Sequence, residues 1–281
     1  MRPIMLHAYN TPGVSRPPPP VILSIAGSDS GGGAGIQADL KTVDAHGMHG
    51  ITAITCVTAQ NTRGVHAVHA LPAAAVASQL QALFEDFPVA AVKIGMLGSA
   101  GIVRAVAAAL RRYRPAQVVL DPVMVATTGA SLSNDAAVRA LVRHLLPLAT
   151  VVTPNLPEAE ALTGMQLRRA ADFDCAASAL RALGAHAVLL KGGHARGAEV
   201  VDRYYDTLGH RSEFRHPRLR VSGHGTGCSL ATAVACGLAQ GLPAVTAVRQ
   251  ATDFLARALS HSYRPGRGQV SVLGHAQARR R

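Results

Sequence analysis

A glycine-rich turn that runs directly into a helix carries the sharpest chemical signal of this chain. The sequence GHGTGC occupies residues 223–228, and a helix of small residues is predicted over 226–240. Backbone N–H groups at the start of such a helix point at one spot, and the helix dipole makes that spot favourable for an anion. We therefore expect Gly225, Thr226 and Gly227 to cradle a phosphoryl group during its transfer.

Cys228 lies in the first turn of this predicted helix. A helix N-terminus lowers the pKa of a thiol, so a thiolate can form there and act as general base for a substrate hydroxyl. The alternative is a small buried side chain, which is our interpretation of Cys56, Cys175 and Cys236. The chain has no CxxC pair, so neither a zinc site nor a disulfide framework is indicated. Reduced thiols are typical of a cytoplasmic protein.

A second glycine cluster, GSDSGGGAG, spans residues 27–35. Gly33, Gly35 and Ala38 fit the dinucleotide pattern GxGxx(G/A) after a predicted strand. That pattern also requires an acidic residue about 20 positions later, and residues 45–84 contain none. We therefore expect a loop whose backbone approaches a ligand closely, with a tight turn lacking any ligand as the alternative.

Polar residues follow several predicted strands, at Lys93, Asp121, Glu158 and Lys191. The carboxyl ends of parallel strands meet at one edge of a sheet, so these side chains are expected to converge. Asp121 and Glu158 can organise Mg²⁺, which proteins hold with one or two carboxylates plus phosphates, and Lys191 can contact a phosphate. Taken singly, each residue is better explained as a turn residue or as a member of a solvated ion pair.

The P-loop is excluded as the phosphate-binding element. The three lysines of the chain are Lys41, Lys93 and Lys191, and none completes the pattern GxxxxGK(S/T). The HRD and DFG motifs of protein kinases are absent as well. Any phosphoryl transfer must therefore use a different scaffold.

Short β-branched runs alternate with longer Ala- and Leu-rich segments. Strands are predicted over 21–26, 51–57, 65–71, 89–94, 117–123, 150–153, 187–190, 200–205 and 212–216. Helices are predicted over 36–46, 73–84, 102–113, 134–146, 173–183, 226–240 and 244–261. Strands separated by helices favour a parallel sheet covered on both faces. We expect one domain over 21–263, after a flexible Pro-rich leader at 1–20 and before a basic tail at 264–281.

The net charge of +12 does not by itself indicate a nucleic-acid partner. Seven of these charges lie in the two end segments, 1–20 and 264–281. Nucleic-acid modules tend to interleave aromatic residues for base stacking, whereas aromatic residues make up 4% of this chain and Trp is absent. A basic nucleic-acid-binding protein is thus a disfavoured alternative. A membrane partner is not expected either, because no apolar run reaches the roughly 20 residues that span a bilayer.

Seven blocks occur in order over most of the chain: AGSDSGGGAGIQADLKT (26–42), TAQNTRGV (58–65), KIGML (93–97), LDPVM (120–124), TPNLPEAEAL (153–162), LLKGGH (189–194) and HGTGC (224–228). In this combination the chain resembles the ribokinase-like superfamily and, within it, the hydroxymethylpyrimidine/phosphomethylpyrimidine kinases of thiamine biosynthesis. The resemblance implies a three-layer α/β/α sandwich with a central, mostly parallel sheet.

The resemblance also implies an activity. Such an enzyme uses ATP and Mg²⁺ to phosphorylate 4-amino-5-hydroxymethyl-2-methylpyrimidine to its monophosphate and then to the diphosphate. A cytoplasmic homodimer is expected. Pyridoxal kinases and hydroxyethylthiazole kinases share the fold and are the alternatives; thiazole kinases also carry GTGC, whereas Gln60 and the GIQAD block favour the pyrimidine.

Site residues follow from the same resemblance. Gln60 is expected to read the aminopyrimidine edge, since an amide can donate to a ring nitrogen and accept from the exocyclic amine. Asp39, Ala34, Gly27 and Met96 are expected to line the same pocket.

The phosphate side of the site follows in the same way. Asn155 and Glu158 resemble the Mg²⁺/phosphate element of the superfamily, and residues 225–227 its anion hole. Cys228 stands where many relatives carry an aspartate base.

Overall fold

Strands and helices alternate along the chain as the sequence predicts. The computed structural model describes residues 17–124, 134–195, 197–219, 221 and 223–279. The strands are β1 (Val21–Asp29), β2 (His49–Asn61), β3 (Gly64–Ala70), β4 (Val89–Ile94), β5 (Val118–Leu120), β6 (Val151–Val152), β7 (Ala187–Leu190), β8 (Glu199–Tyr205), β9 (Arg211–Pro217), β10 (Gly223–His224) and β11 (Ser271–Val272). The helices are α1 (Gly35–Ala45), α2 (Ala73–Asp86), α3 (Ala100–Tyr113), α4 (Asp135–His144), α5 (Leu156–Thr163), α6 (Ala170–Ala182), α7 (Thr226–Ala239) and α8 (Ala244–Ser260).

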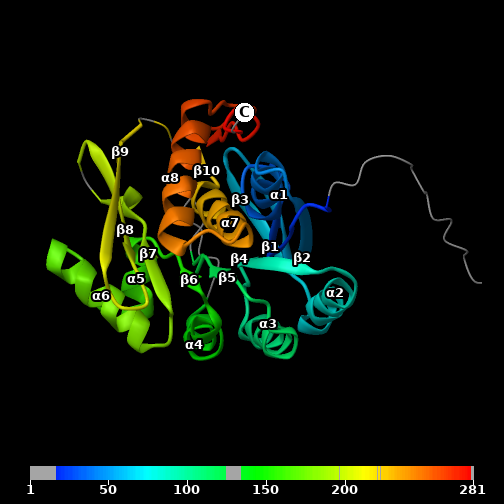
Figure 1. Cartoon of the computed structure of the whole chain (residues 1–281). Coiled ribbons are helices and arrows are strands. Elements are labelled where there is room, and N and C mark those ends of the chain that lie inside the picture. The colour runs from blue at the N-terminus through cyan, green and yellow to red at the C-terminus, as the bar shows by residue number, and fades with distance from the viewer. Residues whose placement is uncertain (1–16, 125–133, 196, 220, 222, 280–281) are drawn as a thin grey trace, which may run out of the picture.

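One nine-stranded sheet runs through the molecule in the order β3-β2-β1-β4-β5-β6-β7-β8-β9 (Figure 1). The six central strands, from β2 to β7, pair in parallel, and β3, β8 and β9 are antiparallel at the edges. Neighbouring parallel strands need crossover connections, which the helices supply. The carboxyl ends of the parallel strands therefore share one edge, where ligands bind in such sheets.

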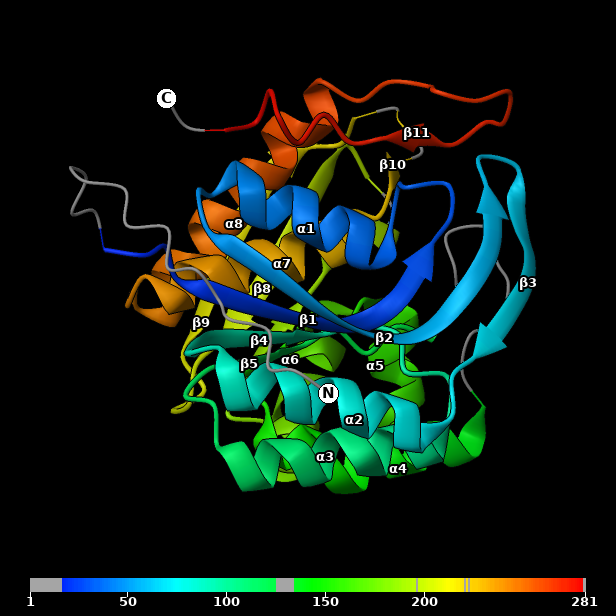
Figure 2. The same ribbon diagram turned by 90° about the vertical axis from the view of Figure 1, so that its right-hand side faces the viewer.

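Helices cover both faces of the sheet (Figures 1 and 2). Successive side chains of a strand point to opposite faces. Val21, Leu23 and Ile25 of β1 accordingly pack with the core residues of α2 to α6, whereas Ile22 packs with those of α1, α7 and α8. The predicted three-layer sandwich with a mostly parallel sheet is confirmed.

A further helix and a longer strand are among the differences from the sequence prediction. Helix α5 begins at Leu156, three residues after the predicted strand 150–153, in a stretch where no helix was predicted. Strand β2 continues to Asn61, four residues beyond its predicted end. As a result, Gln60 lies on a strand. Figure 2 shows β2 and β3 extending past the helical layers at one side of the sheet.

Residues 264–279, expected from their charge to form a basic tail, pack against the domain. β11 pairs in parallel with β10 to form a second, two-stranded sheet, and Val272 and Leu273 are buried. Of the expected leader, residues 1–16 lie outside the described residues. Among the helices of the described ranges, none combines the length and apolar character that crossing a membrane requires.

Candidate active site

Three charged side chains meet at the carboxyl edge of the sheet. Asp121 follows β5, Lys191 follows β7, and Glu158 lies in the first turn of α5. The Lys191 ammonium lies 2.6 Å from Asp121 Oδ1 and 3.6 Å from Glu158 Oε2. Asp121 is 1% exposed and Glu158 5% exposed. The structure thus brings together three residues that the sequence predicted to converge.

The protonation states within this trio depend on one another. Burial raises the pKa of the Glu158 carboxyl; Lys191 opposes this shift, and the nearby Asp121 carboxylate adds to it. Burial lowers the pKa of the Lys191 ammonium, but the carboxylates of Asp121 and Glu158 outweigh burial and hold this pKa above the ordinary 10.5. Lys191 therefore carries a positive charge at neutral pH.

Asn155 fixes the position of Glu158 by capping helix α5. Asn155 Oδ1 accepts the Glu158 N–H at 2.9 Å, and Glu158 Oε2 accepts the Asn155 N–H at 2.7 Å. This reciprocal pair is a capping box, which satisfies two backbone donors at the helix start. The backbone N–H of Lys191 also donates to the Pro154 carbonyl oxygen at 2.9 Å. The segment 154–158 therefore positions the trio, and the Asn155 amide oxygen is engaged in the cap.

The glycine turn before α7 lies directly against the Lys191–Asp121 pair. Gly225 has a φ of +74°, and a Cβ there would collide with the Gly33 carbonyl oxygen, so the turn requires glycine. A Cβ on Gly227 would lie 3.1 Å from Lys191 Nζ and 3.6 Å from Asp121 Oδ2. Asp121 Oδ2 is buried and has no hydrogen-bond partner among the described residues. The N-terminal, positive end of the 14-residue α7 thus lies beside the Lys191 ammonium and beside Asp121 Oδ2, which can still accept a hydrogen bond or bind a cation.

Cys228, the third residue of α7, is half-buried. Burial raises the pKa of its thiol to about 11, although the Lys93 ammonium and the Gly35 N–H favour the thiolate. The sequence predicted a lowered pKa, and the direction was wrong because removal from water outweighs the charges that favour the thiolate.

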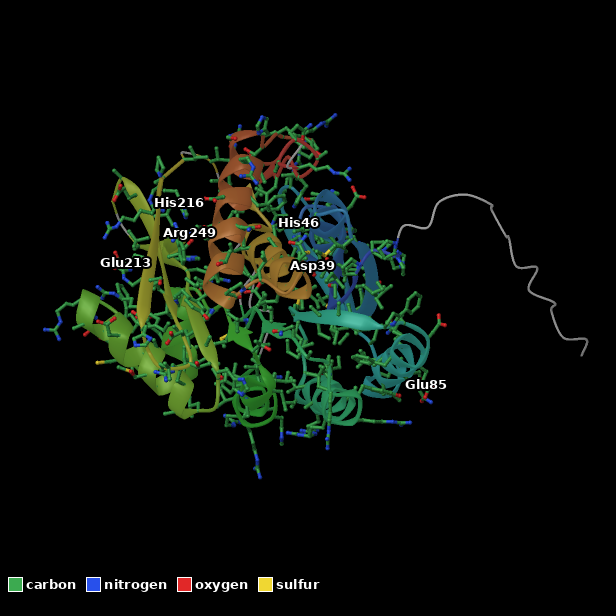
Figure 3. All side chains as sticks on the ribbon, in the orientation of Figure 1. Asp39, His46, Glu85, Glu213, His216 and Arg249 are labelled. Atoms are coloured by element: carbon green, nitrogen blue, oxygen red, sulfur yellow. The ribbon has the colours of Figure 1, made fainter. Side chains whose placement is uncertain are left out.

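A buried ion pair joins strand β4 to helix α1. Lys93 Nζ lies 2.9 Å from both carboxylate oxygens of Asp39, and both side chains are 0% exposed. Asp39 also accepts hydrogen bonds from Ser24 and Thr232, at 2.5 and 2.8 Å. Figure 3 shows Asp39 between α1 and α7. The Asp39 carboxylate thus makes four contacts with three donor groups, those of Lys93, Ser24 and Thr232. The substrate contact expected from the sequence stays a prediction.

Gln60, His224 and Asp29 form a second polar group beside the glycine loops. Gln60 Nε2 lies 2.6 Å from His224 Nε2, which lies 3.1 Å from Asp29 Oδ2. Asp29 also accepts three backbone N–H groups of the loop 31–34 at 2.8 to 2.9 Å. Burial raises the pKa of Asp29, but His224 and these backbone donors outweigh it and hold the pKa below the ordinary 3.8. Asp29 therefore ties the first glycine loop to His224, and His224 to Gln60.

The remaining predicted pocket residues lie next to this group. A Cβ on Gly27 would lie 3.5 Å from Met96 Sδ and 2.6 Å from Cys56 Sγ, so these three residues are packed together. Ala34 is the N-cap residue of α1, and its N–H is one of the three donors to Asp29. Ala34 thus contacts Asp29 of this group, and Gly27 and Met96 pack against Cys56 of β2.

The chain matches the family model described as phosphomethylpyrimidine kinase over residues 29–273. The chain belongs to the phosphomethylpyrimidine kinase family. It is 50% identical over 260 residues to the hydroxymethylpyrimidine/phosphomethylpyrimidine kinase of Rhizobium meliloti, which covers 89% of this chain and 96% of that protein.

Two solved structures extend this family membership to the fold. A phosphomethylpyrimidine kinase from Clostridium difficile is 40% identical with a TM-score of 0.75, over 85% of this chain and 99% of that chain. A pyridoxal kinase from Staphylococcus aureus in complex with AMP-PCP and pyridoxal is 33% identical with a TM-score of 0.84, over 93% and 95%. This phosphomethylpyrimidine kinase family member is therefore a phosphotransferase with a ribokinase-like fold.

The sequence missed three side chains that organise the site of this kinase. For Lys93 the expectation was convergence with Asp121, Glu158 and Lys191 and not the ion pair with Asp39. His224 and Asp29 were noted only as members of glycine-rich blocks. Their partners lie far away along the chain: His224 and Asp29 are 195 positions apart, and Lys93 and Asp39 are 54 apart. A lysine inside an apolar strand was the one available signal, because a buried lysine requires a buried acid.

Proposed function

We propose that this protein transfers the γ-phosphoryl group of ATP to the hydroxymethyl group of 4-amino-5-hydroxymethyl-2-methylpyrimidine, and then to the monophosphate so formed. The observation that carries the proposal is the position of Gly227 at the start of α7, in contact with the Lys191–Asp121 pair. A transferring phosphoryl group needs fixed positive groups around its equatorial oxygens, and this arrangement supplies them.

In the first step the substrate hydroxyl oxygen forms a bond to the γ-phosphorus, and the bond from that phosphorus to the bridging oxygen of ADP breaks. Cys228 accepts the hydroxyl proton at Sγ, which requires its thiolate form. Lys93 favours that form through its charge. In the second step the acceptor is already an ionised phosphate oxygen, so it needs no base.

The side chains at the carboxyl edge fit a Mg²⁺ ion. Asp121 Oδ2 is buried without a hydrogen-bond partner among the described residues, and Glu158 Oε2 lies 3.6 Å from the Lys191 ammonium. Within the described part of the chain no group of three or more His, Cys, Asp or Glu could hold a metal by itself. This suits Mg²⁺, which uses one or two carboxylates and completes its shell with phosphates and waters. The ion would neutralise charge on the ATP phosphates.

Gln60 is the proposed reader of the pyrimidine. Its amide can donate to a ring nitrogen and accept from the exocyclic amine. Contacts to His224 and Thr58, at 2.6 and 3.3 Å, fix where the amide lies. Gly27, Ala34 and Met96 are the other residues proposed to line the pyrimidine pocket.

A coupled assay of ADP release tests the proposal, with the pyrimidine alcohol, its monophosphate, pyridoxal and hydroxyethylthiazole as separate acceptors. We expect the two pyrimidines to give the highest kcat/KM. A higher kcat/KM for pyridoxal would contradict the assignment and favour the alternative, a pyridoxal kinase like the Staphylococcus aureus protein to which this chain is similar.

We also propose that the enzyme works in the cytoplasm as a homodimer. The four cysteines are unpaired in the structure, which suits a reducing compartment. Sedimentation of the purified protein tests the dimer, and a monomer at micromolar concentration would contradict it.

A further inference from the structure

Residues 264–279, which we call the C-terminal strap, contact the turn after β2, strand β10 and helix α7. Tyr263 and Val272 exchange two backbone hydrogen bonds, at 2.8 and 3.0 Å, which close the first part of the strap into a loop. The Gly268 N–H donates to Thr62 Oγ1 at 3.0 Å. Thr62 follows Gln60 by two positions, so this loop touches the turn that carries the proposed pyrimidine reader.

The strap then holds β10 in place. Val272 of β11 is paired with His224 of β10. A Cβ on Gly33 would lie 2.6 Å from His224 Cδ2 and 3.3 Å from Val272 Cγ2. The His224 ring and Val272 therefore pack against the same glycine of the first loop. Val272 is only 3% exposed, whereas the side chains of a solvated tail would be exposed. This part of the strap is therefore packed against the domain.

A buried hydrogen bond anchors the strap to α7. His275 Nε2 lies 2.9 Å from Ser229 Oγ, and His275 Nδ1 lies 3.1 Å from Leu273 O. Burial lowers the pKa of His275 to about 4, so the ring is neutral at pH 7. Its Nδ1–H then donates to Leu273, and its Nε2 accepts the Ser229 hydroxyl proton. Ser229 follows Cys228 directly, so the anchor lies one residue from the proposed base.

We infer that the C-terminal strap is part of the pyrimidine side of the active site and that His275 is its positioning residue. His275 acts through Ser229 and β10 on His224, and His224 acts on Gln60. The kinetic part of this inference rests on the proposed function, whereas its structural part can be tested without any substrate.

The substrate-free test is amide hydrogen exchange on His275→Phe, which keeps the ring volume and removes both polar contacts. We expect exchange of residues 223–228 to rise about tenfold or more, with β7 and α3 protected as in the unmodified protein. His210→Phe is the matched control, because His210 is exposed and lies in the turn between β8 and β9, away from the strap. Unchanged exchange over 223–228 in His275→Phe would overturn the inference.

The kinetic test compares the KM values of the two substrates. For Ser229→Ala and His275→Phe, we expect KM for the pyrimidine alcohol to rise about tenfold while KM for ATP stays within twofold, since a buried polar group has lost its partner. The double variant should be no worse than either single variant, because both remove one interaction. Equal rises in both KM values would show a general structural role and overturn the positioning role. If the unmodified enzyme fails to phosphorylate the pyrimidine alcohol, the proposed function fails, and hydrogen exchange still decides the role of the strap.

Discussion

A Cβ on Gly227 would lie 3.1 Å from the Lys191 ammonium, closer than most real Cβ contacts. Gly227→Ala must therefore displace Lys191 from its place beside Asp121. We expect kcat/KM for the pyrimidine alcohol to fall about tenfold or more, because small displacements of a positioning group are costly in phosphoryl transfer. Steady-state kinetics measure this effect. Thermal unfolding should change little, since alanine is favourable inside a helix.

Gly101→Ala is the matched control for this change. Gly101 is the second residue of α3, as Gly227 is of α7, and a Cβ there would meet its nearest neighbour at an ordinary 3.7 Å. This variant should keep full activity. Equal activity of the two variants would show that the Gly227–Lys191 contact does not matter for transfer.

The Lys93–Asp39 pair should contribute to folding stability, in addition to the effect of the Lys93 charge on the Cys228 thiolate. Lys93→Met leaves the Asp39 carboxylate buried without its cation, and we expect the free energy of unfolding to fall by about 3–5 kcal/mol. Thr232→Val removes a single hydrogen bond to Asp39 and should cost only about 1 kcal/mol. Urea unfolding measures both values. A loss near 1 kcal/mol in Lys93→Met would contradict the importance of the ion pair.

The raised pKa of Cys228 predicts that the first phosphorylation depends on pH and that the second does not. A base with a pKa of about 11 is mostly protonated at neutral pH. The kcat of the first step should therefore rise about tenfold per pH unit between pH 7 and 10. The second step should stay flat over this range, because its acceptor is already ionised. A pH–rate profile of the first step that is flat as well would remove Cys228 from the role of base.

Gln60 should affect binding of the pyrimidine more than turnover. Gln60→Ala removes the amide, and we expect KM for the pyrimidine alcohol to rise about tenfold or more, with kcat changed by less than threefold. Gln81→Ala is a suitable control, because Gln81 is exposed on α2 and bonded to Glu85. An unchanged KM in Gln60→Ala would place the pyrimidine elsewhere.

Local sequence patterns predicted most of the fold correctly, but they did not predict helix α5. Short apolar runs separated by Ala- and Leu-rich segments indicated the central strands and seven of the helices. α5 has eight residues with Pro157 in its first turn, so it shows little helical periodicity. Its capping box, Asn155 followed three residues later by Glu158, was the signal that could have revealed it.

The parts of the site that depend on short sequence motifs could be predicted from the sequence. The glycine turn at 225–227 and the polar residues after the strands converge because parallel strands share one edge. The state of Cys228 was not predictable, because it depends on how much water the fold excludes. The strap was missed for a similar reason: its charge suggested a tail, and only pairing with β10 shows that Val272 and Leu273 are buried.

The most direct test of the central claim is a ³¹P NMR time course of the enzyme with ATP, Mg²⁺ and the pyrimidine alcohol. The predicted result is a phosphomonoester signal that grows and then gives way to a diphosphate signal as ADP accumulates. With Cys228→Ala, monoester formation should slow by about 100-fold, while added monoester is still converted to the diphosphate at a rate close to that of the unmodified enzyme. An unmodified enzyme that forms ADP without either pyrimidine product, or forms neither, would contradict the claim.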